Sequence, residues 1–223
     1  METQVIKHSR FYNQLMQSPT LKLLMDETAK KLKAENKLRN KFYNDLTPSI
    51  KAEFINGEII MHSSVKLRHS QASDNLYRLL STYVIKNKLG SVHHEKLLIK
   101  LTRNDYEPDI CFFNKEKSGK FNADQMFFPA PDFVVEVLSP STEKIDRVTK
   151  YEDYAAHGVE EYWIIDPEKQ LVEQYLLTET GYELNMKSKT GMLKSKAVNY
   201  FEIPVHAIFD EKTNLKILNE LFV

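Results

Sequence analysis

The chain has 223 residues, of which 42% are hydrophobic and 28% charged, a composition typical of one globular domain with an extension or of two small domains. Its 31 basic and 31 acidic residues give a formal net charge of zero, which argues against a strong nonspecific DNA binder but permits a local basic groove. Cys111 is the only cysteine, so an internal disulfide is excluded, and its apolar neighbours predict a buried structural thiol.

No apolar run approaches the roughly 20 residues that a membrane-spanning helix needs. The first residues also lack the apolar stretch of a signal peptide. We therefore expect a cytoplasmic protein that does not interact with a membrane.

The first 45 residues differ from the rest of the chain. Apolar residues at helical spacings predict a helix from about Thr20 to Asn40 that ends before Thr47-Pro48: Leu21, Leu24, Met25, Leu32 and Leu38. Because this stripe is thin, the helix either packs on the main domain or serves as an arm for protein interaction or dimerisation. We divide the chain into a helical extension, 1–41, and a main domain, 42–223.

Residues 52–101 predict a hairpin, a helix and a strand in that order. The hairpin spans 52–61 around the turn Asn56-Gly57. The helix spans 67–88, and its buried stripe consists of Ala72, Leu76, Leu80, Tyr83 and Val84. Residues 92–101 alternate loosely between apolar and polar side chains and indicate a strand.

Two later runs, 108–113 and 132–138, are apolar on both faces and predict central, covered strands. A helix from Ser141 or Thr142 to about Ala156 follows, then a strand at 161–166 and a hairpin at 171–187. The tail from Gly191 is strand-like and ends in a short helix. This order predicts an α/β fold, a mixed sheet with helices on its faces.

Glu136 and Asp109 stand out because each places a carboxylate in or beside a buried strand. Burial of an ionised carboxylate is costly unless it is paired with a cation, and the alternative to a functional site is a salt bridge to a nearby Lys or Arg. If the two strands are neighbours, the carboxylates would repel each other, and a divalent cation would remove the conflict. Oxygen ligands favour Mg²⁺ or Mn²⁺ over Zn²⁺. Asp132 is interpreted as the residue that begins its strand.

The segment from Pro129 to Pro167, PAPDFVVEVLSPSTEKIDRVTKYEDYAAHGVEEYWIIDP, closely resembles the Uma-two family of restriction-endonuclease-like proteins. That family belongs to the PD-(D/E)XK nuclease superfamily. The upstream segments INGEII and YEPDICFF and the helical His69 extend the resemblance to about residues 42–200. It implies a restriction-endonuclease-like fold, a mixed sheet flanked by helices, and a metal-dependent endonuclease that hydrolyses phosphodiester bonds of nucleic acid, with DNA as the expected substrate. Cleavage of both strands of a duplex would favour a homodimer.

The resemblance also implies a set of metal ligands. Asp109 on one strand and Glu136 on the next, with the backbone carbonyl of Val137, would hold Mg²⁺ or Mn²⁺. Glu58 in the hairpin matches a third acidic position, where it would bind a second ion or orient the first ligands.

The resemblance further implies a catalytic lysine. The usual lysine follows the strand acid by two residues, but this chain has Leu138 there, and the resemblance suggests that Lys150 replaces it from the next helix. Asp146, Lys150 and Tyr154 are spaced i, i+4 and i+8, so they share one helix face. His69 is either a half-buried, hydrogen-bonded side chain or a supporting residue near the site.

Two alternatives remain open. Leu138 and the zero net charge also fit a catalytically silent binding module on a nuclease fold. A protein-interaction factor acting through residues 1–45 would explain the extension but not the buried acids. A nuclease should gain thermal stability with Mn²⁺ or Mg²⁺, whereas a pure interaction module should not.

Overall fold

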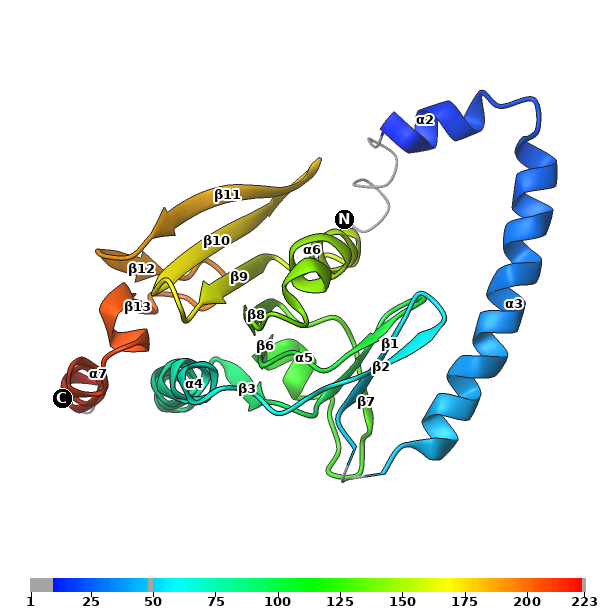
Figure 1. Ribbon diagram of the computed structural model, residues 1–223. Helices are drawn as coiled ribbons and strands as arrows, with labels where there is room; N and C mark the ends of the chain where they lie inside the picture. The colour runs from blue at the N-terminus through cyan, green and yellow to red at the C-terminus, as the bar shows by residue number, and fades with distance from the viewer. Residues whose placement is uncertain (1–9, 48–49, 222–223) are drawn as a thin grey trace.

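The computed structural model describes residues 10–47 and 50–221 (Figure 1). Within these ranges the helices are α2 (Arg10–Met16), α3 (Leu21–Asp45), α4 (Leu67–Asn87), α5 (Lys115–Ser118), α6 (Tyr151–Ala156) and α7 (Glu211–Glu220), with a π-helix η1 (Ile145–Lys150) and a 3-10 helix η2 (Val205–Ile208). None of the helices in these ranges is long and apolar enough to cross a membrane.

The strands of the described residues form three sheets. Their bounds are β1 (Ala52–Ile55), β2 (Glu58–Met61), β3 (Gly90–His94), β4 (Leu98–Lys100), β5 (Asp105–Tyr106), β6 (Ile110–Asn114), β7 (Phe127–Phe128), β8 (Phe133–Val137), β9 (Glu161–Asp166), β10 (Leu171–Thr178), β11 (Gly181–Ser188), β12 (Met192–Lys194) and β13 (Glu202–Pro204). The large sheet has the order β11-β10-β9-β8-β6-β3, the smaller one β2-β1-β5-β4-β7, and β12 pairs with β13.

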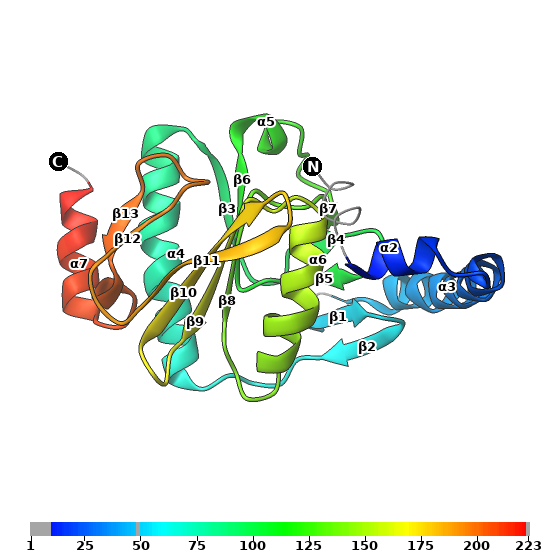
Figure 2. The ribbon, with the colours of Figure 1, turned by 90° about the horizontal axis from the view of Figure 1, so that it is seen from above.

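The large sheet is mixed, because β8 pairs in parallel with β9 while its other strand pairs are antiparallel. Helix α4 covers one face and α6 the other (Figure 2). Side chains alternate between the faces, so Phe133, Val135 and Val137 pack toward α4 while Val134 packs toward α6. The predicted mixed sheet flanked by helices is therefore confirmed.

Two local predictions need correction. The strand expected over 92–101 is split into β3 and β4, which lie in different sheets, because Glu95 and Lys96 have φ of 51° and 52° and break the extended backbone. The helix expected to run to Ala156 begins as the π-helix η1. The expected hairpin at 52–61 and the helix at 67–88 are found as β1–β2 and α4.

Helix α3 is longer than predicted and packs on the smaller sheet only through its C-terminal part. Figure 1 shows its N-terminal half standing away from the domain. Arg39 is buried and donates from Nε and Nη2 to the two carboxylate oxygens of Asp105 at 2.6 and 2.7 Å. The expected division at residues 41 and 42 falls inside this helix, and the independence of the two parts stays a prediction.

We expect Arg39→Ala to lower the free energy of unfolding by about 3 to 5 kcal/mol, because Asp105 would remain buried with its cationic partner removed. Urea denaturation measures this change. The control is Lys37→Ala, an exposed residue of the same helix, whose effect should stay within about 0.5 kcal/mol. Equal effects of the two substitutions would mean that the ion pair does not hold α3 on the domain.

Candidate functional site

A cavity of about 560 Å³ opens where the C-terminal end of β8 meets the N-terminal end of α4. Its walls come from segments 62–66, 136–143 and 166–169, and its floor is acidic. A volume of this size lies within the usual range for pockets that take small ligands or single residues of a polymer. The cavity is the candidate functional site.

Asp109 and Glu136 come together on this floor. In the antiparallel pair β6–β8, Ile110 lies opposite Val135, so the next residues along, Asp109 and Glu136, are neighbours on the α6 face of the sheet. The backbone N–H of Val137 donates to Asp109 Oδ2 at 2.8 Å and fixes that carboxylate beside β8. The two predicted strand acids therefore share one face.

Lys150 is the central cation of the site and is 1% exposed. Its Nζ lies 2.9 Å from Glu53 Oε1, 3.0 Å from Glu136 Oε1 and 3.2 Å from Asp146 Oδ1. Tyr154 also donates its hydroxyl to Glu136 Oε1, at 3.3 Å. The expectation that the Lys150 amine lies within reach of Glu136 is confirmed, although its part in a reaction stays a proposal.

The π-helix η1 presents Asp146 and Lys150 to the floor. Single π-helical turns occur often at functional sites, because the wider turn changes which side chains point inward. Arg147, between them, points to the other side and pairs with the buried Glu173, with 2.8 Å between Nη1 and Oε2. This pair fastens η1 to β10 and so helps to hold Lys150 in place.

The hairpin acid that contacts Lys150 is Glu53 in β1, and not Glu58 as expected. Neither of these two residues lines the cavity, and Glu58 begins the solvent-facing strand β2. Glu53 is 1% exposed and contacts Lys150. The sequence contains an indication of this role, because Glu53 is a charged residue among the apolar residues of Ala52–Ile55. Glu136 has the same kind of surroundings in its own strand.

The electrostatics of the floor show a shortage of positive charge. Burial, and then the nearby Asp146, Asp109 and Glu53, raise the pKa of Glu136 well above its usual range against the opposing effect of Lys150. Burial lowers the pKa of Lys150, but the carboxylates of Glu136, Glu53 and Asp146 outweigh burial and raise that pKa well above its ordinary value.

At the cavity wall, His69 and Lys51 support Asp109. His69 Nε2 lies 3.3 Å from Asp109 Oδ2, and Lys51 Nζ lies 3.6 Å from Oδ1. Burial raises the pKa of Asp109, but the bonds from His69 and Val137 and the charge of Lys51 outweigh it and hold that pKa at about 2. Asp109 is therefore ionised at neutral pH. His69 lies beside this carboxylate, and its supporting role in the site stays a prediction.

The polar groups of the cavity are incompletely satisfied. Among the described residues, the buried side-chain atoms without a hydrogen bond are His62 Nε2, His69 Nδ1, Glu107 Oε2 and Asp146 Oδ1, and all of these residues line the cavity. His62 and Asp146 still lie within ion-pair distance of Glu53 and Lys150. Burial raises the pKa of Glu107 to about 7.

The chemistry of these side chains, and not their present arrangement, suits a divalent cation. The floor offers carboxylate oxygens with one buried lysine among them, and the donor set suits Mg²⁺ or Mn²⁺. In the described part of the chain, no group of three carboxylate, imidazole or thiolate side chains already stands in metal-ligand geometry. Lys150 lies between Glu53, Glu136 and Asp146, so these side chains would have to shift to share an ion.

Residues 40–205 match the Uma2 family, described as "Putative restriction endonuclease". The chain belongs to the Uma2 family. A relative from Synechocystis sp. strain PCC 6803, "Uncharacterized protein sll1609", is 30% identical over 132 residues, which cover 56% of this chain and 71% of that protein. Uma2 membership thus covers the cavity and its floor.

A solved structure from Anabaena variabilis ATCC 29413, described as "a putative nuclease belonging to DUF820", shares the fold of this Uma2 chain. Its TM-score is 0.66 at 18% identity, over 80% of this chain and 97% of that one. At this identity the likeness establishes the fold.

Proposed function

We propose that the chain is a metal-dependent endonuclease that hydrolyses phosphodiester bonds of nucleic acid, with DNA as its substrate. The observation that carries the proposal is the meeting of Asp109 and Glu136 on one sheet face beside the buried Lys150. Membership of the Uma2 family and the likeness to a described nuclease fold support it. A structural sheet has no need of several buried carboxylates that compete for one lysine.

The metal ligands in this proposal are Asp109, Glu136 and the carbonyl oxygen of Val137, with Glu53 in the place expected for Glu58. Mg²⁺ or Mn²⁺ held there would lower the pKa of a bound water and neutralise charge on the scissile phosphate. His69 and Lys51 hold the Asp109 carboxylate in its ionised form, which is the form that binds a cation.

In this proposal, Lys150 acts on the attacking water and on the scissile phosphate. Its ammonium group is fixed by Glu136, Glu53 and Asp146, so it can orient a water molecule or stabilise the additional negative charge of the transition state. Tyr154 positions Glu136 by its hydrogen bond.

A cleavage screen tests the proposal. The purified chain is incubated with supercoiled plasmid, single-stranded DNA and RNA, with Mn²⁺ or Mg²⁺ or with EDTA. We expect metal-dependent products from DNA, and none from Glu136→Gln at the same concentration. If neither metal supports cleavage of any of these substrates, the assignment as a nuclease is wrong.

The second candidate is a catalytically silent binding module on the nuclease fold. Leu138 in the place of the usual lysine, and the occupation of the floor by the Lys150 ion pairs, favour it. A silent module would bind DNA without cutting it and would show no gain of thermal stability with Mn²⁺.

A further inference from the structure

Segment 63–68, which runs from the end of β2 into the first two residues of α4, offers a row of backbone donors at the cavity. Within the described residues, none of the N–H groups from Ser63 to Arg68 donates a hydrogen bond to another group of the chain. Neighbouring residues do so on both sides, since His62 N donates to Lys51 O and His69 N to Lys66 O. Free N–H groups that lead into a helix form a site for anions.

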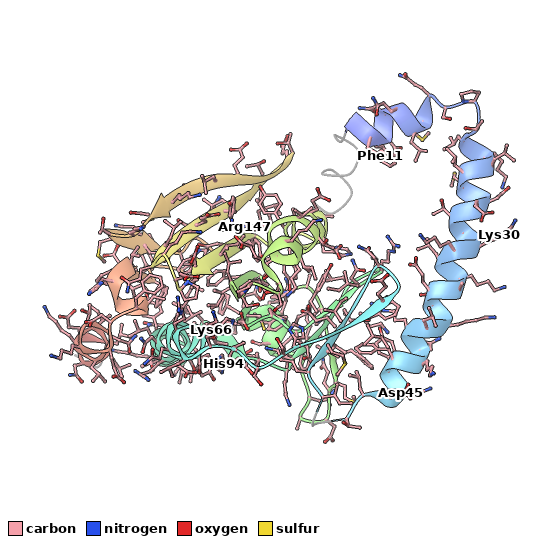
Figure 3. All side chains as sticks on the ribbon, in the orientation of Figure 1. Phe11, Lys30, Asp45, Lys66, His94 and Arg147 are labelled. Atoms are coloured by element: carbon pink, nitrogen blue, oxygen red, sulfur yellow. The ribbon has the colours of Figure 1, made fainter. Side chains whose placement is uncertain are left out.

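The side chains of this segment add positive charge. Lys66 and Arg68 both line the cavity, and Figure 3 labels Lys66 where the chain enters α4. Lys66 forms no ion pair with any described residue, and the first turn of α4 contains no acidic residue. Arg68 Nη1 lies 3.1 Å from Glu168 Oε1, but both side chains are exposed. Because an exposed ion pair is weak, a phosphate can displace Glu168 from Arg68.

A buried side chain next to this segment also has an unsatisfied polar atom. His69, in the first turn of α4, is 5% exposed and lines the cavity, and its Nδ1 has no hydrogen-bond partner. The helix also lacks a side-chain cap at Lys66. At this end of α4, one side-chain atom as well as several backbone N–H groups therefore lack hydrogen-bond partners among the described residues.

Another part of the cavity lining supplies hydroxyl groups. Ser139, Ser141 and Thr142 line the cavity, where Ser139 shares hydrogen bonds with the other two and Thr142 also bonds to Asp146. Hydroxyl groups and free backbone N–H groups contact phosphate oxygens without reading a base. The two parts of the lining together suit the sugar-phosphate backbone of a nucleic acid.

The depth of the acidic floor restricts the form of that nucleic acid. Glu136 is 3% exposed, and Asp146 and Lys150 are each 1% exposed, so a scissile phosphate must enter the cavity to reach them. A flexible single strand can bend its backbone into this cavity of about 560 Å³, whereas a stiff base-paired duplex would have to be deformed to bring a phosphate to the same depth. One cut then severs the strand, so one copy of the site suffices.

We propose that segment 63–68 binds a phosphate of a single-stranded nucleic acid, next to the phosphate that lies over the acidic floor. This inference rests on the proposed nuclease function and names the form of its substrate. Lys66, Arg68 and the free N–H groups form the flanking-phosphate subsite, and Ser139, Ser141 and Thr142 line the channel.

Fluorescence anisotropy tests this subsite without requiring cleavage. The probe is a fluorescein-labelled 12-nucleotide DNA, single-stranded or paired with its complement, in Ca²⁺ in place of Mn²⁺. We expect the intact chain to bind the single strand at least tenfold more tightly than the duplex. The double variant Lys66→Ala/Arg68→Ala should lose at least tenfold in affinity for the single strand, and its salt dependence should become shallower by about 1.4 in log–log slope, or about 0.7 per lost phosphate contact.

The matched control is Lys212→Ala/Lys216→Ala, which removes two exposed lysines from α7, outside the cavity, and should leave binding unchanged. Tighter binding of the duplex, or full affinity in the Lys66→Ala/Arg68→Ala variant, overturns the inference. A variant that loses single-strand binding in a chain that cleaves nothing with Mn²⁺ supports the subsite and refutes the nuclease.

Discussion

Asp109→Asn is expected to abolish the stabilisation of the chain by Mn²⁺ and to reduce cleavage by at least about a hundredfold. The substitution removes a negatively charged ligand, and even groups that only orient a ligand change metal affinity or activity by about 10- to 100-fold. An asparagine oxygen can still accept the hydrogen bond of Val137 N–H, so the fold should persist. Differential scanning fluorimetry with and without Mn²⁺ measures the first effect.

The size of the expected shift follows from binding linkage. At a concentration of 100 times Kd, Mn²⁺ stabilises a folded protein by about 2.7 kcal/mol, which raises Tm by about 5 to 10 °C for a chain of this size. The control is Asp132→Asn, a second buried aspartate that pairs with Lys117 instead of lining the cavity. It should lower Tm but keep the full response to Mn²⁺. A full response in Asp109→Asn would remove Asp109 from the ligands.

The two strand acids could be found from the sequence because burial of charge needs no knowledge of topology. Glu136 stands among valines, and Asp109 precedes an apolar run, so each residue conflicts with its surroundings unless it binds a cation. Alternation along β6 and β8 then places both on one face. Alternation does not show that these two strands are neighbours. That expectation came from the resemblance to the Uma-two family.

The choice between Glu53 and Glu58 could not be made from the hairpin pattern alone. Both strands of the hairpin contain apolar residues, and Ile59 and Ile60 in β2 suggest a buried strand as strongly as Phe54 and Ile55 do in β1. In the structure β1 pairs with β5 as well as with β2 and is buried throughout, whereas β2 is the edge strand. Burial of β1 therefore depends on a strand distant in sequence, which local pattern does not encode.

The π-helix η1 and the break at Glu95-Lys96 were missed for a related reason. A helical stripe of i and i+4 residues predicts that Asp146 and Lys150 share a face, but it does not show where a turn widens. The alternation over 92–101 continues through the break, although the chain there passes from one sheet to the other. In both places tertiary packing, rather than local preference, decides the backbone.

Lys150→Ala is expected to reduce cleavage by about a hundredfold to a thousandfold and to lower the free energy of unfolding by about 3 to 5 kcal/mol at neutral pH. Both effects come from the removal of one buried cation. Glu53, Glu136 and Asp146 would remain buried together without the ammonium that now contacts all three. The control is Lys144→Ala, an exposed lysine of the same segment, which should change neither quantity.

The loss of stability with rising pH should become steeper in this variant, because Lys150 in the native chain lowers the pKa values of Glu136 and Asp146, which burial raises. Lys150 itself has a raised pKa, so its stabilising effect in the native chain is complete below its ordinary pKa of 10.5 and constant between pH 5 and pH 8. Without it, burial and mutual repulsion hold the pKa values of the carboxyl groups in the folded state above those in the unfolded state. Such groups favour the folded state at low pH, and their stabilising effect is lost as pH rises through the folded pKa values.

Urea denaturation of Lys150→Ala at pH 5.5 and pH 8 therefore should show the higher stability at pH 5.5, and the cleavage loss should persist wherever the variant is folded. If the variant unfolds at pH 8, Mn²⁺ should restore it, because the ion neutralises the same carboxylates. Near-normal cleavage by the folded variant would mean that another cation orients the water and stabilises the phosphate. Normal stability at pH 8, with cleavage lost, would instead show that Lys150 acts in the reaction without holding the floor together.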